Sequence, residues 1–156
     1  MNSAILLIGS NIEPERNSRQ AISLLQSMVR IERFSRPWVI PSFGSPGPDF
    51  INIAVQISTE LSKEEIKQDV IGTIENQLGR VRQGNKNAPR TIDLDIILFN
   101  GELIDKDIWR RPYVVLPVAD LAPELARPGD HLLLHEIADG LQASLPVRVM
   151  DGSLRD

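Results

Sequence analysis

The sequence predicts an α+β fold of the ferredoxin-like class, and two observations lead to that prediction. Apolar and polar residues alternate over 50–58, which is typical of a strand with one buried face. Apolar residues recur at helical spacing over 13–29 and again over 62–78. Up to residue 99 the expected order is strand, helix, strand, strand, helix, strand, the βαββαβ order of ferredoxin-like antiparallel sheets. Both helices would then cover one face of the sheet and leave the other open, with a C-terminal extension after residue 99.

The first half of the chain carries clear local signals. The apolar run 4–8 predicts a buried strand, which ends at "GSN". A helix is expected from Glu13, with Pro14 near its first position and Ser10 or Asn11 as its N-cap. A second strand is expected over 31–40. The stretch "PSFGSPGP" at 41–48 holds three prolines and two glycines, so it predicts a loop.

The second half is regular up to residue 99. Ser62 and Glu65 form a capping box, and the helix that follows has one apolar stripe. A loop is expected over 79–90 and the fourth strand over 91–99. The last third is less regular, with "YVVLPVADLAPE" and a short helix around 133–138. The apolar stripe consists of Ile66, Val70, Ile74 and Leu78.

Composition restricts the class of protein. The 156 residues are 42% apolar and 24% charged, which predicts a single globular domain over 1–156. The net charge of -4 argues against an extended basic surface, so we expect no nucleic-acid partner. Without cysteine, disulfides and thiolate metal sites are excluded, and a cytoplasmic location is expected. The apolar run 4–8 is too short for a signal peptide or a membrane span, so no membrane partner is expected.

The fourth strand places two acidic side chains on one face. Residues two apart on a strand share a face, so Asp93 and Asp95 lie opposite the apolar residues. Two carboxylates on one face repel unless an arginine, a raised pKa or a divalent metal compensates. Two solvated surface acids are the simpler alternative. The apolar face, expected to meet the helices, consists of Ile92, Leu94, Ile96 and Leu98.

The preceding loop, "GRVRQGNKNAPR", is basic and contains no acidic residue. Mobile cations beside a carboxylate metal site suit a polyphosphate, although a solvated loop that pairs with the two acids is an alternative. On the third strand, Phe50 and Asn52 face the open side of the sheet. They could stack on and hydrogen-bond to a flat heterocycle, or they could be a half-covered aromatic and a solvated amide. The chain has no GxxxxGK[ST] and no GxGxxG motif, so phosphates are not held by a Walker-type loop.

Five stretches occur in the order seen in one enzyme family. "IGSN", "PDFINIAV", "IENQLGRVR", "APRTIDLDIILF" and "VVLPVADLAPEL" resemble the 6-hydroxymethyl-7,8-dihydropterin pyrophosphokinases over nearly the whole chain. The resemblance implies a ferredoxin-like fold and a monomer. It also implies Mg-dependent transfer of pyrophosphate from ATP to the pterin hydroxymethyl group, with release of AMP, in folate biosynthesis.

The resemblance also implies roles for individual residues. The metal ligands would be Asp93 and Asp95, which hold two magnesium ions. Catalysis would depend on Arg80, Arg82, Arg90 and Asp95. The pterin would contact Pro41, Phe43, Gly44, Phe50, Asn52 and Tyr113. The nucleotide would contact Glu75, Arg82, Arg90, Ile96 and Arg111.

One segment departs from the family pattern. The family usually has a longer stretch after the aspartate strand, with a Pro-His pair whose histidine contacts ATP phosphate. Here that stretch is "NGELIDKDIWRR", without histidine, where Lys106, Trp109 and Arg110 are the residues that could compensate. Two alternatives therefore stay open: a pterin-binding protein with poor turnover, and another two-aspartate nucleotidyl transferase.

Overall fold

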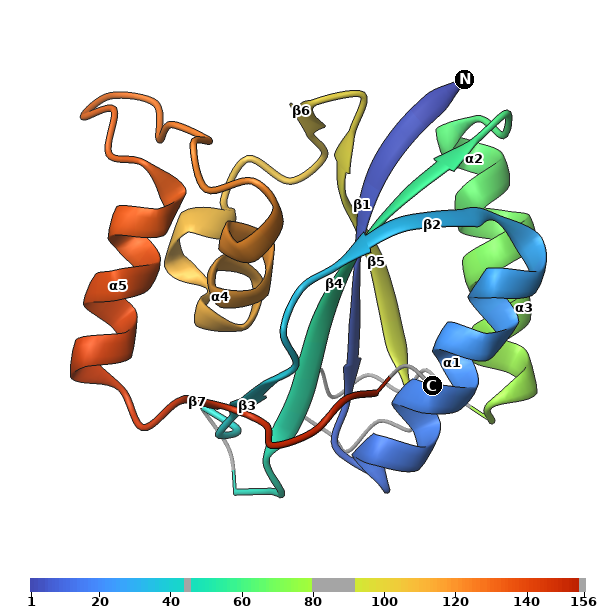
Figure 1. Cartoon of the computed structure of the whole chain (residues 1–156), viewed down its shortest axis with the longest axis horizontal. Helices are drawn as coiled ribbons and strands as arrows, with labels where there is room; N and C mark the ends of the chain where they lie inside the picture. Colours follow the sequence, from blue (N-terminus) through green and yellow to red (C-terminus); the bar gives the residue numbers. More distant parts are fainter. Residues whose placement is uncertain (44–45, 80–91, 155–156) are drawn as a thin grey trace.

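The computed structural model describes residues 1–43, 46–79 and 92–154, and shows a twisted seven-stranded antiparallel sheet with helices on both faces (Figure 1). The sheet order is β6-β5-β1-β4-β3-β7, and β2 also pairs with β4. Among the described residues, no helix combines the length and apolar character that a membrane span requires. The strands are β1 (Asn2–Ser10), β2 (Arg30–Phe34), β3 (Trp38–Ile40), β4 (Phe50–Thr59), β5 (Asp93–Phe99), β6 (Glu102–Leu103) and β7 (Arg148–Val149).

The helices fall into two groups. One group consists of α1 (Pro14–Met28) and a continuous helical stretch made of α2 (Lys63–Glu65), the π-helical η1 (Ile66–Ile71) and α3 (Gly72–Gln77). The other consists of the 3-10 turn η2 (Ile108–Arg110), α4 (Pro112–Leu121) and α5 (Leu134–Ser144). The two groups lie on opposite sides of the sheet (Figure 1).

The two predicted helix starts have different outcomes. The capping box is confirmed, because the Ser62 hydroxyl accepts from Glu65 N (3.1 Å) and the Glu65 carboxylate accepts from Ser62 N (3.0 Å). The N-cap prediction for the first helix is wrong. Its N-cap is Glu13 in a left-handed conformation (φ 40°), and the Glu13 side chain makes no capping hydrogen bond. The Ser10 hydroxyl instead donates to the Ile12 carbonyl at 3.1 Å.

The expected strand over 31–40 is broken into β2 and β3. The break falls at Ser35–Pro37, because a proline has no N–H to donate to a ladder. Ser35 keeps the pairing with β4: its N–H donates to the Ala54 carbonyl, and its hydroxyl accepts from Ala54 N, both at 2.8 Å. Ser35 therefore keeps hydrogen bonds to β4 at the point where the chain bends.

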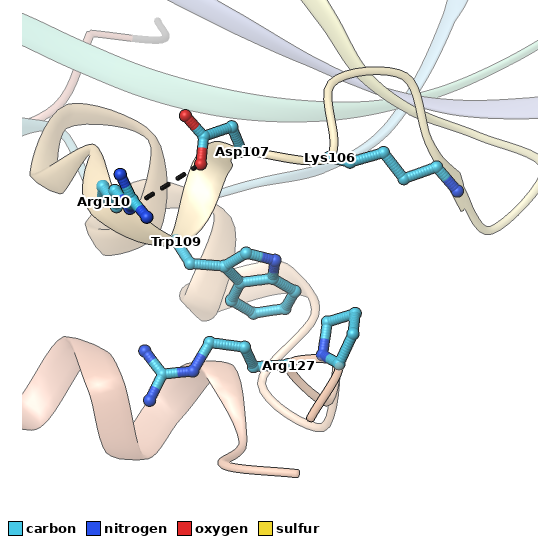
Figure 2. Close-up of a pocket in the computed structure, with 6 residues that line it drawn as sticks. Lys106, Asp107, Trp109, Arg110 and Arg127 are labelled. Carbon is cyan, nitrogen blue, oxygen red and sulfur yellow. Dashed lines mark ion pairs between the residues drawn. The ribbon is translucent and has the colours of Figure 1, made fainter. Parts of the chain in front are cut away.

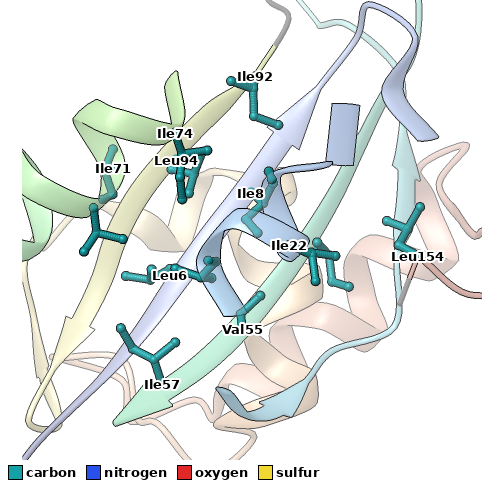
Figure 3. Close-up of a cluster of buried hydrophobic side chains, with 14 of the residues drawn as sticks. Leu6, Ile8, Ile22, Val55, Ile57, Ile71, Ile74, Ile92, Leu94 and Leu154 are labelled. Atoms are coloured by element: carbon teal, nitrogen blue, oxygen red, sulfur yellow. The ribbon is translucent and has the colours of Figure 1, made fainter. Parts of the chain in front are cut away.

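The first hydrophobic core lies between the sheet and the group formed by α1 and α3 (Figure 3). The predicted core face of the third strand is confirmed, since its residues are all buried there. The helical stripe over 66–78 packs against the same core. The members from β4 are Ile51, Ile53, Val55 and Ile57, and those from β5 include Leu94, with Ile92 just before the strand.

The fourth strand contains a bulge that the sequence did not reveal. Leu6 pairs with Ile96, but the next residue of β1, Ile5, pairs with Leu98, so Ile97 is extra. An extra residue reverses the alternation of side chains beyond it. Leu98 and Ile97 therefore face the opposite core. The prediction that Leu98 shares a face with Leu94 is wrong for this reason.

The opposite face of the sheet is partly covered by a second core. Here α4 packs over β1, β3 and β4, and α5 packs against α4, so the prediction that this face stays open is wrong for the part that α4 covers. The sequence gave little sign of α4, because its run of valines is typical of a strand and Pro117 lies inside it. Sheet residues in this core include Ile5, Leu7, Trp38, Ile40 and Ala54.

If the second core is integral to the fold, shortening a side chain at its centre should lower the stability of the whole chain. Leu116 of α4 is fully buried, so we expect Leu116→Ala to lower the free energy of unfolding by about 2–5 kcal/mol. Leu132 is 39% exposed, and Leu132→Ala should cost under about 1 kcal/mol as the matched control. Urea unfolding followed by circular dichroism measures both. Equal losses in the two variants would contradict the assignment.

Candidate active site

The pairing of three strands places an aspartate, a glycine and an amide in one row. Gly9 of β1 lies opposite Asn52 on one side and opposite Asp93 on the other. Asn52 in turn lies opposite Trp38 of β3. Directly opposed residues of an antiparallel sheet share a face. The row Asp93–Gly9–Asn52–Trp38 therefore crosses the sheet on the face that carries the second core.

Gly9 is required by close approach within this row. A Cβ at position 9 would lie 2.6 Å from Asn52 Oδ1, closer than real contacts of that kind. The absence of a side chain allows the Asn52 amide to lie over the backbone of β1. Gly9 was not among the predicted site residues, although the "GSN" that ends the first strand contains it.

Asn52 is the most informative side chain of the row. It is 3% exposed, and its Nδ2 is buried with no hydrogen-bond partner among the described residues. Buried amide donors are nearly always paired, so an unpaired one calls for an explanation. A ligand acceptor placed beside Asn52 provides one. The sequence prediction that Asn52 contacts a bound heterocycle fits this geometry.

The two aspartates extend the site along β5. Asp95 lies opposite Leu7, one step further along the same face, and is exposed, whereas Asp93 is half-buried. Among the described residues, no group of three acidic or histidine side chains is arranged to hold a metal ion. Magnesium usually takes one or two carboxylates and fills its other positions with water and substrate phosphates. The donor set present therefore fits magnesium.

The backbone between the two aspartates is held from the helix side. Glu75 of α3 is 5% exposed, and its Oε2 accepts from Leu94 N at 3.1 Å. This contact connects α3 to the residue between Asp93 and Asp95, across from β1. The sequence assigned Glu75 to the nucleotide; the structure places its carboxylate beneath the aspartate strand.

Aromatic and basic candidates lie around this face. Phe50 is half-buried opposite Ile40, and Tyr113 is exposed in the first turn of α4, the helix that packs over β4. Arg111, just before α4, donates to the Asp105 carboxylate, and that hydrogen bond raises the pKa of Arg111. The backbone N–H of Asp107 and, after it, the Arg111 guanidinium lower the pKa of Asp105. The Arg111 guanidinium is thus already engaged on one side.

The remaining predicted residues are only partly accounted for. Pro41 and Phe43 follow β3, and the Phe43 ring is exposed. Ile96 packs against the first core, on the far side of the sheet from the aspartates. Predicted site residues outside the described residues are Gly44, Arg80, Arg82 and Arg90.

Trp38 was missed by sequence reasoning, although it ends the row. It is 1% exposed, and its Nε1 donates to Asp120 of α4 at 3.3 Å. The Asp120 carboxylate also accepts hydrogen bonds from the backbone N–H of Arg36 (2.9 Å) and from the Arg36 guanidinium. The hydrogen bond from the guanidinium raises the pKa of Arg36. The guanidinium lies 5.0 Å from the Trp38 ring centroid. No local signal could reveal a contact between residues 82 positions apart.

Comparison with known proteins places the chain in a family. A family model described as 7,8-dihydro-6-hydroxymethylpterin-pyrophosphokinase matches residues 5–123. A 2-amino-4-hydroxy-6-hydroxymethyldihydropteridine pyrophosphokinase of Synechocystis sp. is 32% identical over 138 residues, 81% of this chain and 70% of that protein. The protein of the same name in Haemophilus influenzae is 30% identical over 145 residues, 85% of this chain and 89% of that protein.

These matches define an enzyme that transfers a pyrophosphate group. The chain belongs to the 7,8-dihydro-6-hydroxymethylpterin-pyrophosphokinase family.

Among solved structures, Plasmodium falciparum HPPK-DHPS with SDX-DHP has a TM-score of 0.64 at 13% identity. The alignment covers 92% of this chain and 45% of that longer one, a likeness of fold alone.

The close approach at Gly9 can be tested without a ligand. We expect Gly9→Ala to displace the Asn52 amide and to cost roughly 1–3 kcal/mol of stability, because the added methyl overpacks the row. Gly140 lies within α5 with open space around it, so Gly140→Ala should stabilise by about 0.5–1 kcal/mol. Urea unfolding and the side-chain amide resonance of Asn52 are the readouts. An unmoved resonance in Gly9→Ala would refute the contact.

The Glu75 contact predicts a difference between two substitutions. Glu75→Gln keeps an acceptor for Leu94 N, whereas Glu75→Met leaves that N–H unpaired, at a cost of about 1–3 kcal/mol. Amide hydrogen exchange at Leu94 should therefore stay slow in the glutamine variant and become fast in the methionine variant. The same exchange rate in both would mean that the carboxylate does not hold this backbone.

Proposed function

We propose that this chain transfers pyrophosphate from ATP to the hydroxymethyl group of 6-hydroxymethyl-7,8-dihydropterin, with magnesium, releasing AMP in folate biosynthesis. The observation that carries the proposal is the row in which the unpaired amide of Asn52 and the carboxylate of Asp93 flank Gly9 on one face of the sheet. Family membership supports the reaction class.

Asn52 would recognise the pterin ring. An amide presents one acceptor and two donors in a plane, which matches the donors and acceptors along the edge of a pterin. Its Nδ2 would gain the acceptor that the described residues do not supply. Phe50 lies on the same face of β4, and Tyr113 begins the helix over that face, so both could stack against the ring. Pro41, Phe43 and Gly44 would close over the bound pterin.

Asp93 and Asp95 are the residues that would hold two magnesium ions. When bound, the metal makes the pterin hydroxyl oxygen a better nucleophile and neutralises charge on the ATP phosphates. The aspartates themselves orient these groups, because β1 on one side and Glu75 on the other fix the backbone between them. Positioning of this kind contributes much of the rate in phosphoryl transfer.

Arginines would complete the nucleotide side. Arg80, Arg82 and Arg90 would stabilise charge on the transferred group, and Arg111 would meet the phosphates with the donors that Asp105 leaves available. Glu75 and Ile96 would lie near the nucleotide. The strand order β5-β1-β4-β3 supports a single ferredoxin-like domain, and we expect a cytoplasmic monomer.

One observation favours a second candidate, a pterin-binding protein with weak turnover. The segment 100–111 forms only β6 and η2, contains no histidine, and engages Arg111 with Asp105. A short nucleotide side could lower turnover while leaving the Asn52 row intact. A two-aspartate nucleotidyl transferase is disfavoured, because it would not need Asn52 in this position.

The deciding experiment measures AMP release from ATP with magnesium, with and without the pterin. We expect pterin-dependent AMP, and a loss of at least about a hundredfold in Asp95→Asn, because the isosteric amide removes the ligand charge. Asp69→Asn, an exposed acid on η1, is the matched control and should retain activity. Pterin binding by calorimetry without AMP release would favour the weak-turnover candidate. If the protein neither binds the pterin nor releases AMP, both candidates are overturned.

A further inference from the structure

A hollow lies in the C-terminal third of the chain, and none of the residues of the row lines it (Figure 2). Its volume is about 310 Å³. The segment between β6 and α4 forms one side, and the loop between α4 and α5 forms the other. Its lining residues are Lys106, Asp107, Trp109, Arg110, Arg127 and Pro128.

The hollow is predominantly cationic. Lys106, Arg110 and Arg127 contribute three positive charges, against the carboxylate of Asp107 in the lining and that of Asp130, which pairs with Arg127. Lys106 makes no ion pair within the described part of the chain. Arg110 Nε lies 3.8 Å from Asp107 Oδ1, and both side chains are well exposed, so this pair constrains the guanidinium little. Lys106 and the loosely paired Arg110 thus leave an excess of positive charge in the hollow.

Arg127 is held in place by its own partner. Its Nε donates to Asp130 Oδ1 at 3.0 Å and its Nη2 donates to Asp130 Oδ2. The guanidinium lowers the pKa of Asp130 to about 2, so the pair persists throughout the neutral range. A guanidinium has five N–H donors, and two are used here. The others remain for an oxyanion at a fixed place.

Trp109 adds a flat wall and an unpaired donor. In Figure 2 its indole ring lies between Lys106 and Arg127. The indole Nε1 is buried and has no hydrogen-bond partner among the described residues. An indole nitrogen can only donate, so it requires an acceptor. Cations, an unpaired donor and an aromatic face together match an oxyanion that carries a flat group.

We propose that this hollow binds a small organic anion, a phosphate or a carboxylate attached to a flat ring. The oxyanion lies among Lys106, Arg110 and Arg127, and the ring rests on Trp109. The hollow shares no residue with the row or with the aspartates. It does contain Lys106, Trp109 and Arg110, the residues that the sequence suggested could take the place of the family's ATP-contacting histidine.

The test uses the indole N–H resonances of the ¹⁵N-labelled protein. The chain has two tryptophans, so a Trp109→Phe variant assigns both signals. Phenyl phosphate and benzoate are the probes, and inorganic phosphate lacks the ring. We expect the Trp109 signal to shift saturably at about 1 mM phenyl phosphate or benzoate, while the Trp38 signal stays in place. The probe that binds with the lower Kd shows whether the hollow prefers a phosphate or a carboxylate.

Substitutions in the hollow test whether binding there causes the shift of the Trp109 signal. Lys106→Met and Arg110→Met replace exposed side chains, and each should weaken binding about tenfold or more. Lys63→Met, at an exposed lysine of α2, is the control and should leave binding unchanged.

Several results would overturn the proposal. They are no Trp109 shift up to about 10 mM, equal weakening in the control, or an equal response to inorganic phosphate alone. A shift of Trp38 in place of Trp109 would likewise place the probe at the row and not in this hollow.

Discussion

The antiparallel pairing of β1 with both β4 and β5 is the constraint on which the site depends. The two ladders meet at Gly9, so a one-residue slip in either would send Asn52 or Asp93 to the other face of the sheet. The first core prevents such slips, because Leu6 and Ile8 are fully buried beneath the helices. The packing on one side of the sheet thereby fixes the polar groups on the other.

Residues near in sequence were predicted well, and contacts between distant elements were not. The alternation over β4 correctly placed Asn52 on the face opposite Ile53, and the "DLD" of β5 correctly separated Asp93 from Leu94. The bulge at Ile97, the helix α4 and the contact of Asp120 with Trp38 escaped prediction. Each depends on a partner far along the chain, and propensity describes only neighbours.

The second core changes how the site is understood. A sheet covered on one face alone would offer a broad, wet surface to a ligand. Here α4 covers the middle of the opposite face and restricts the site to the end of the sheet where Gly9 and Asp93 lie. The hydrogen bonds of Asp120 to Trp38 and Arg36 attach this helix to β3 beside Asn52. The amide therefore sits in a buried setting, where an unmet hydrogen bond costs more.

The bulge at Ile97 divides β5 into two parts, of which only the second also pairs with β6. Before it, the strand keeps Asp93 and Asp95 in register with β1; after it, the strand pairs with β6 and leads into the segment 100–111. A bulge absorbs a change in chain length within one strand. The hairpin and the loop beyond it can therefore be shortened or extended over evolutionary time without moving the carboxylates. The sequence of segment 100–111 can therefore change without a change in the position of Asp93 and Asp95.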